Sequence, residues 1–213
     1  DNSGIKASGS GDNYAIYLSN VSNTTVDKLD LSSTIGYQGW GVVVQNSASN
    51  RNVTIKNCKM NNRFSGIYCI GGKDYTITGN DLQNSGNDNT RAALYLSGIR
   101  PGTLPAGVVA SGNLFGTGIS RTALRVSDMD GLLIGDAGVV GAHIVVEDTS
   151  GVNSMSTDGD NAVIYLNAVS NLTVNDVDVS RSASGRSGVG IWVENSGITA
   201  FRNGDYAASA REF

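Results

Sequence analysis

A four-residue pattern recurs along the chain: one residue that is usually small, one apolar residue, one variable residue and a second apolar residue. In a β-strand the two apolar positions share one face, and the variable position points to the other face. The pattern therefore predicts short strands with a buried side and an outward side. Its eight occurrences, 25 residues apart on average, are AIYL (15–18), GVVV (41–44), GIYC (66–69), ALYL (93–96), ALRV (123–126), HIVV (143–146), VIYL (163–166) and GIWV (190–193).

A second pattern follows the first in most of these units. The stretches TTVDKLDL (24–31), VTIKNCKM (53–60), YTITGNDL (75–82) and LTVNDVDV (172–179) align without gaps, and VVASGNLF (108–115) fits with one shift of register. Residues 13–32 and 161–180 are identical at eleven of twenty positions. Each unit thus predicts three short strands with turns between them.

One such unit is too small to bury its own apolar face, whereas stacked units give every strand a parallel neighbour about 4.8 Å away. The predicted fold is all-β: a single-stranded, right-handed parallel β-helix of about eight coils over residues 13–201. A propeller blade, a leucine-rich repeat and an immunoglobulin-like sandwich fit the spacing less well. Asn80 and Asn113 take equivalent turn positions in consecutive coils, where stacked amides can hydrogen-bond to each other.

The repeated N-x-T-apolar and G-N signatures, as in residues 171–174 and 79–80, resemble the pectin-lyase-like β-helix superfamily. The resemblance covers roughly residues 13–201 and implies the fold. It leaves the activity open, because that superfamily includes lyases, hydrolases, phage tailspikes and binding modules.

Composition narrows the class of function. Hydrophobic residues make up 39% of the 213 residues, which supports a core, and the net charge of −4 argues against a nucleic-acid partner. No apolar run is long enough to cross a bilayer. Because residue 1 is Asp, we expect a single β-helix domain over 1–213 from a larger protein, with 202–213 as a cap or linker. Cys58 and Cys69 fall on apolar strand positions and are expected to be buried free thiols.

Stacking brings the variable position of each unit into one outward column. Five of its eight members are aromatic in a chain that is 7% aromatic: Tyr17, Val43, Tyr68, Tyr95, Arg125, Val145, Tyr165 and Trp192. Such a column would run about 35 Å, or seven strand spacings of about 4.8 Å. One interpretation is ordinary cross-strand packing of tyrosines. The other is a platform of rings that stack on the C–H faces of a linear polysaccharide.

Polar residues beside the column would complete such a platform. Trp40 lies in the turn before one strand, and the next outward positions include Gln45, Glu147, Asn167 and Glu194, which suit sugar hydroxyls. The loop 97–107 contains both prolines. It could form one side of a binding groove into which Arg100 reaches, or it could be an ordinary surface insertion.

The sequence contains no recognisable group of catalytic residues. The single histidine, His143, has no readable Ser/His/Asp partners, and the paired aspartates, Gly-His-Gly, Arg-x-Lys and R-x-P-x-x-R elements of the superfamily's hydrolases and lyases are absent. Glu147 and Glu194 would lie two coils apart, about 9.6 Å, near the upper limit for an inverting glycosidase. Calcium is conceivable at four aspartates in Gly-containing turns, although such residues also occur as ordinary turn formers: Asp128, Asp130, Asp158 and Asp160.

The sequence therefore predicts a non-catalytic carbohydrate-binding module without a resident cofactor. It resembles the parallel β-helix modules attached to bacterial plant-polysaccharide hydrolases, notably xylanases. That resemblance implies a secreted protein, xylan or a related plant cell-wall polymer as ligand, and a catalytic domain in the same polypeptide. The alternatives are a β-helix polysaccharide lyase or hydrolase, and a structural stalk such as a phage tail fibre or surface adhesin.

Overall fold

The structure is a computed structural model of the chain. It describes residues 13–34, 39–45, 48–86, 92–99, 108–115, 122–134, 144–145, 162–175, 177–178, 189–197 and 199–202. All regular structure in these residues is β-strand, and the strands pair in parallel. In the part described, no helix has the length and apolarity needed to cross a membrane.

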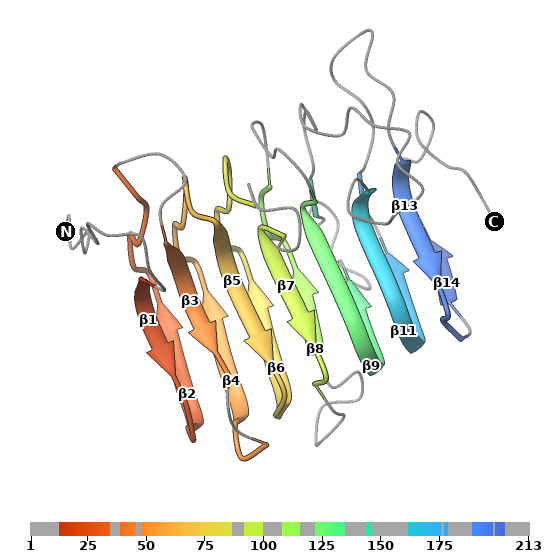
Figure 1. The fold of residues 1–213 in the computed structure, drawn as a ribbon, viewed down its shortest axis with the longest axis horizontal. Coiled ribbons are helices and arrows are strands. Elements are labelled where there is room, and N and C mark those ends of the chain that lie inside the picture. Colours follow the sequence, from red (N-terminus) through yellow and green to blue (C-terminus); the bar gives the residue numbers. More distant parts are fainter. Residues whose placement is uncertain are drawn as a thin grey trace, which may run out of the picture.

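Twelve of the strands belong to one sheet that is laid out as two rows (Figure 1). The first row contains β1 (Tyr14–Leu18), β3 (Trp40–Val44), β5 (Ser65–Ile70), β7 (Leu94–Ser97) and β13 (Val189–Glu194). The second row contains β2 (Ser22–Asp27), β4 (Arg51–Lys56), β6 (Lys73–Thr78), β8 (Val108–Ser111) and β14 (Thr199–Arg202). Two long strands, β9 (Leu124–Ile134) and β11 (Ala162–Asn175), run through both rows.

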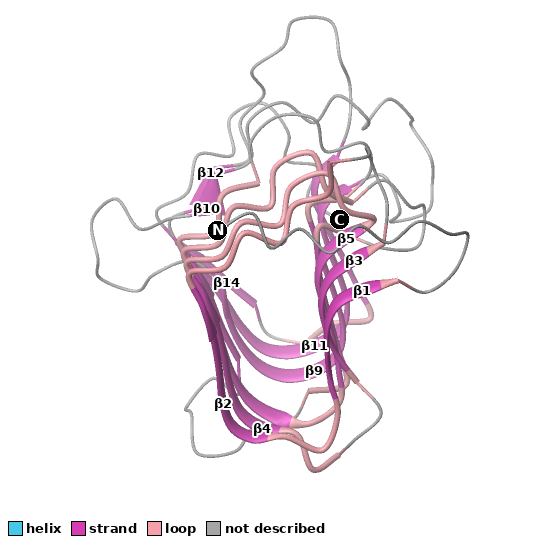
Figure 2. Cartoon of the chain, turned by 90° about the vertical axis from the view of Figure 1, so that its left-hand side faces the viewer, coloured by secondary structure: helices cyan, strands magenta, loops and turns pink. Residues whose placement is uncertain are grey.

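The chain alternates between the rows, so that each pass adds one strand to each of them. Figure 2 looks along the stack: the rows form two facing walls, and β9 and β11 curve from one wall to the other. The strands of the described residues make seven such passes, because β9 and β11 each supply a whole pass. The stacking of short parallel strands that the sequence predicts is thereby confirmed.

The predicted third strand of each unit is present only in part. In the first four passes it is reduced to isolated parallel bridges, which join Asp30 to Lys59, Lys59 to Asp81, and Asp81 to Leu114. A single bridged residue per pass is too short to form a continuous ladder. The third side is therefore a column of stacked turns within these residues.

One predicted rung is wrong. Val145 belongs to the short strand β10 (Ile144–Val145), which pairs with β12 (Val177–Asp178) in a separate two-stranded sheet. In the main sheet Arg125 pairs directly with Tyr165, with no rung between them. The predicted units at 123 and 143 are thus one pass of 40 residues. Ile144 and Val145 match the apolar pattern without belonging to the main sheet, since a pattern of four residues does not specify its partner.

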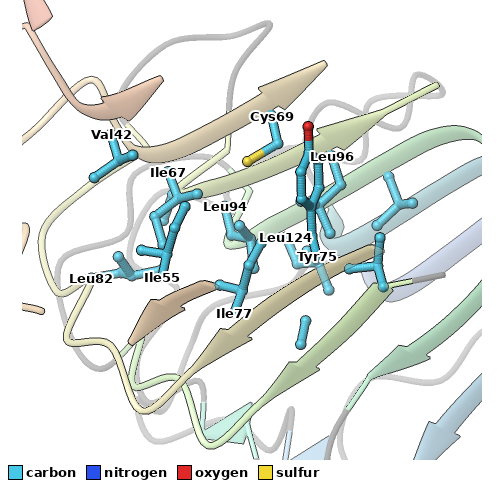
Figure 3. Close-up of a cluster of buried hydrophobic side chains, with 14 of the residues drawn as sticks. Val42, Ile55, Ile67, Cys69, Tyr75, Ile77, Leu82, Leu94, Leu96 and Leu124 are labelled. Atoms are coloured by element: carbon cyan, nitrogen blue, oxygen red, sulfur yellow. The ribbon is translucent and has the colours of Figure 1, made fainter. Parts of the chain in front are cut away.

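The core lies between the two walls. Figure 3 shows side chains of the first row, such as Ile67 and Leu94, directed toward Ile55 and Ile77 of the second row. All four are fully buried. Each such side chain contributes roughly 1.5–3 kcal/mol relative to an exposed position.

Apolar ladders continue this core along the stack. Ile77 pairs with Ala110, so residues 108–115 align with 75–82 without the shift of register expected from the sequence. The predicted turn ladder is confirmed by burial of all its members in the described passes: Leu31, Met60, Leu82 and Phe115. Cys58 and Cys69 are buried free thiols, as predicted.

A buried amide ladder holds the turns of successive passes together. Asn80 Nδ2 donates to Asn113 Oδ1 at 2.9 Å and to the carbonyl of Ile55 at 3.0 Å. Asn80 Oδ1 in turn accepts from the backbone N–H of Cys58 at 3.0 Å. These bonds satisfy backbone groups that the tight turn leaves without strand partners, which confirms the predicted role of the stacked asparagines.

Candidate functional site

The outward positions of the first row form the column that the sequence predicts, apart from Val145. The parallel register places the following residues on consecutive strands in this order: Tyr17, Val43, Tyr68, Tyr95, Arg125, Tyr165 and Trp192. We call these seven residues the aromatic column. Their alignment follows from the two-residue period of a strand, because the flanking apolar residues point into the core.

In the N-terminal half of the column the rings pack against each other. The rings of Tyr68 and Tyr95 are stacked, with centroids 4.7 Å apart and an angle of 15° between their planes. Trp40 meets Tyr68 edge-on, with a centroid distance of 4.6 Å. Tyr14 links Tyr17 and Trp40, at centroid distances of 5.2 and 6.1 Å. Several ring faces that could stack on a sugar are therefore already in contact with another ring.

Tyr14 is a member of this cluster that the sequence analysis missed. It is the register partner of Trp40, three residues before the column position in both strands. An ungapped alignment of the first two units at that position would have revealed the pair of aromatic residues. The four-residue pattern starts at Gly41 and therefore predicts a turn at Trp40, whereas Trp40 begins β3 and is buried.

In the C-terminal half, charged and aromatic side chains are combined. The guanidinium carbon of Arg125 lies 4.7 Å from the ring centroid of Tyr165, a cation–π contact. Glu194 accepts hydrogen bonds from the hydroxyl of Tyr165 and, at 3.3 Å, from the indole N–H of Trp192. Burial, followed by the hydrogen bond to the Glu194 carboxylate, raises the pKa of Tyr165 to about 12. The phenol therefore stays protonated and keeps donating at neutral pH.

The side chains of the aromatic column are less exposed than an open binding surface would require. Tyr17 is 41% exposed, whereas Tyr165 is 6% exposed and Val43 is fully buried. The other members of the aromatic column are half-buried: Tyr68, Tyr95, Arg125 and Trp192. The column is less accessible than its outward direction predicts, because rings on neighbouring strands cover one another.

A second outward column runs beside the first and carries polar groups. Strand pairing joins Ser97 to Ser127, Ser127 to Asn167, and Asn167 to Glu194. The hydroxyls of Ser97 and Ser127 are hydrogen-bonded at 3.0 Å, and Asn167 Oδ1 accepts from Asn195 Nδ2 at 3.2 Å. Toward the N-terminus this second column contains Ile70, the register partner of Ser97.

The sequence predicts two further polar residues in this column. Gln45 directly follows Val44, the register partner of Cys69, and its backbone N–H donates to the carbonyl of Leu18, which continues the pairing of β1 with β3. Glu147 lies outside the described residues, but the position predicted for it, between Ser127 and Asn167, does not exist because these two residues are direct partners. The expected carboxylate pair of Glu147 and Glu194 two coils apart in one column is therefore wrong.

The predicted calcium ligands are only partly described. Asp128 is exposed, with a φ of 54°. Asp130 lies in β9 as the register partner of Ser170, while Asp158, Asp160 and the loop residue Arg100 lie outside the described residues. Within the described ranges, no group of three or more His, Cys, Asp or Glu side chains is arranged to hold a metal.

The described site is thus an elongated surface of two adjacent columns, one aromatic and one that is polar except at Ile70. It offers ring edges, hydroxyls, a guanidinium and a carboxylate on four neighbouring strands, β7, β9, β11 and β13. The chain matches no protein-family model, no curated protein and no solved structure.

Proposed function

We propose that the chain is a right-handed parallel β-helix of the pectin-lyase-like kind whose aromatic column binds a linear plant cell-wall polysaccharide, with xylan favoured, without cleaving it. The observation that carries the proposal is the unbroken register from Tyr17 to Trp192 along one side of the stack. Six strand spacings give this column a length of about 29 Å, which suits an extended chain better than a single sugar.

Adsorption through this surface needs no catalytic group. Half-buried rings offer apolar edges and hydroxyls, and the polar column beside them offers hydrogen-bond partners for sugar hydroxyls. Many shallow contacts of this kind give modest affinity. In a secreted protein with a catalytic domain in the same polypeptide, such a module would raise the effective concentration of the enzyme at its substrate.

A lyase or hydrolase is less well supported by the described residues. Glycoside hydrolysis usually requires two carboxyl groups on either side of the scissile bond. Among the described residues of its column Glu194 has no second carboxylate, and it already accepts hydrogen bonds from Tyr165 and Trp192.

A structural stalk or adhesin is the second candidate, and the packing of the rings favours it. The stacked pair of Tyr68 and Tyr95, with Trp40 edge-on to Tyr68, could serve only to hold neighbouring strands together. On this alternative the aromatic column would contribute to stability and would not recognise any glycan.

Affinity electrophoresis distinguishes these functions. The protein is run in native gels that contain xylan, glucomannan, β-glucan or pectin, and reducing sugar is measured in parallel digests. We expect retardation in the xylan gel and no sugar release. Retardation in no gel would favour the structural role, and released sugar would favour an enzyme.

A further inference from the structure

The two halves of the aromatic column have different neighbours, which bears on where a ligand would bind. In the N-terminal half, Val43 is fully buried and the adjacent outward position of β5 is the apolar Ile70. The ring faces of Tyr68 and Tyr95 are stacked on each other. Its polar positions, Ser19 and Gln45, lie just beyond the ends of β1 and β3, and its rings are engaged with one another.

In the C-terminal half, every strand presents one column residue and one polar residue side by side. The pairs are Arg125 with Ser127 on β9, Tyr165 with Asn167 on β11, and Trp192 with Glu194 on β13. We call these six residues the polar half. Five of them are half-buried, and Tyr165 is buried beneath the Arg125 guanidinium.

The polar half is also held in place by its own contacts. Glu194 accepts from Tyr165 and Trp192, which lie on two different strands, and Arg125 rests on the ring of Tyr165. A carboxylate has about four lone-pair sites, so two such bonds leave Glu194 able to accept from a ligand. A surface whose side chains are already ordered loses less conformational entropy on binding.

We propose, on the basis of the function proposed above, that the ligand binds on the polar half and that Glu194 and Arg125 determine its specificity for a neutral sugar chain with free hydroxyls. Within the aromatic column, the N-terminal half contributes less to binding, because its rings pack on one another. Two strand spacings between β9 and β13 give a contact length of about 10 Å.

The mixture of charges in the polar half selects the class of ligand. The Glu194 carboxylate accepts from sugar hydroxyls but repels a uronate carboxylate, while the guanidinium edge of Arg125 and the amide of Asn167 donate to hydroxyl oxygens. The net charge of −4 adds to the repulsion of an acidic polymer. Acetylation of the sugar hydroxyls would remove the donors that Glu194 requires.

The test compares variants of the two halves on matched polymers. Glu194→Gln and Asn167→Ala probe the polar half, and Tyr17→Ser probes the N-terminal half. Thr25→Ala, at an exposed position of β2 in the second row, is the control. Binding is measured by affinity electrophoresis on deacetylated xylan, on the same xylan with its acetyl groups, and on polygalacturonate. Thermal unfolding of each variant checks that it folds.

We expect wild-type protein and Thr25→Ala to bind deacetylated xylan alike, and Tyr17→Ser to lose less affinity than either polar-half variant. Both polar-half variants should bind about tenfold more weakly or worse, which is the effect of losing a charged or oriented hydrogen bond. Acetylated xylan and polygalacturonate should retard the wild type much less. If Glu194→Gln does not fold, the affinity of Asn167→Ala for deacetylated xylan tests the proposal.

Two outcomes would overturn the inference while leaving the proposed function intact: Tyr17→Ser alone weakens binding, or the wild type binds acetylated xylan or polygalacturonate as well as deacetylated xylan. A wild type that is retarded by no polymer would overturn the proposed function itself, and this inference with it.

Discussion

Two glycines show how closely the turns of this stack are packed. Gly72 and Gly98 both have positive φ values, 82° and 61°, in a region that residues with a Cβ adopt only with strain. Their surroundings differ. A Cβ at Gly72 would lie 2.5 Å from both the carbonyl oxygen of Asn50 and the hydroxyl of Tyr75, whereas a Cβ at Gly98 would meet its nearest heavy atom at 4.0 Å.

Alanine at these two positions should therefore have unequal effects. Gly98→Ala adds only backbone strain, and we expect it to lower the free energy of unfolding by about 1–2 kcal/mol. Gly72→Ala adds a clash with the backbone of the preceding pass and should cost clearly more, or prevent folding. Urea denaturation of both variants checks this, and equal midpoints would contradict the packing described at Gly72.

The contacts of Asn80 could be predicted from the sequence only in part. Its spacing from Asn113 indicated a stacked pair, and the structure confirms their hydrogen bond. The bonds from Asn80 to the backbone of Ile55 and Cys58 were not predictable, because they depend on how the preceding turn curves toward it.

Asn80→Ala would deprive the buried backbone N–H of Cys58 and the carbonyl oxygen of Ile55 of their bonds to this side chain. Asn113 Oδ1 would keep its bond from the backbone N–H of Asn80. We expect a loss of about 2–4 kcal/mol in the free energy of unfolding, since each orphaned buried group costs about 1–3 kcal/mol. Gln83→Ala is the matched control, because among the described residues that amide bonds to Asp81 within its own turn, and Gln83 is half-buried. Denaturant midpoints that shift equally for both would contradict the buried ladder.

At the scale of elements, the rings of the first row act between strands. Tyr68 on β5 contacts Tyr95 on β7 and Trp40 on β3, so one side chain connects three neighbouring strands. Strand alternation made the shared face predictable. The ring orientations were not predictable, because the plane of an aromatic ring is set by the side chains on both adjacent strands.

Tyr68→Leu should therefore destabilise the fold more than Tyr17→Leu. Each aromatic pair is worth about 0.5–1.5 kcal/mol beyond the buried area, so the loss of two pairs at Tyr68 should cost about 1–3 kcal/mol. Tyr17 is 41% exposed, and its one described ring contact, with Tyr14, is tilted. Guanidinium denaturation followed by near-UV circular dichroism measures both, and a larger loss at Tyr17 would contradict this assignment.

For the whole molecule, stability should depend on pH in the alkaline range. Burial raises the pKa of the Cys58 and Cys69 thiols and of the phenols of Tyr75 and Tyr165 above their ordinary values. In the unfolded chain these groups lose protons from about pH 8.5 for thiols and about pH 10 for phenols. The native state then holds more protons than the unfolded state, so the free energy of unfolding falls as pH rises.

We expect the urea midpoint to be constant from about pH 7 to 8 and to fall steadily toward about pH 11. Cys69→Ala should lower the midpoint at neutral pH, because it leaves a cavity, and should make the decline near pH 9 shallower. A midpoint that stays level or rises between about pH 8 and 11 would contradict the burial of these groups.

The sequence by itself determined the parallel stacking, the face on which each strand residue lies and most of the register. These follow from one local rule, the alternation of side chains along a strand, repeated with matching apolar positions that stack only in register. Tertiary structure decided the rest. It paired Ile144 and Val145 outside the main sheet, buried Tyr165 although it points outward, and brought the hydroxyl of Tyr165 to Glu194. Burial and hydrogen bonding of this kind depend on side chains from neighbouring passes, which lie 20 or more residues away in the chain and which no local pattern specifies.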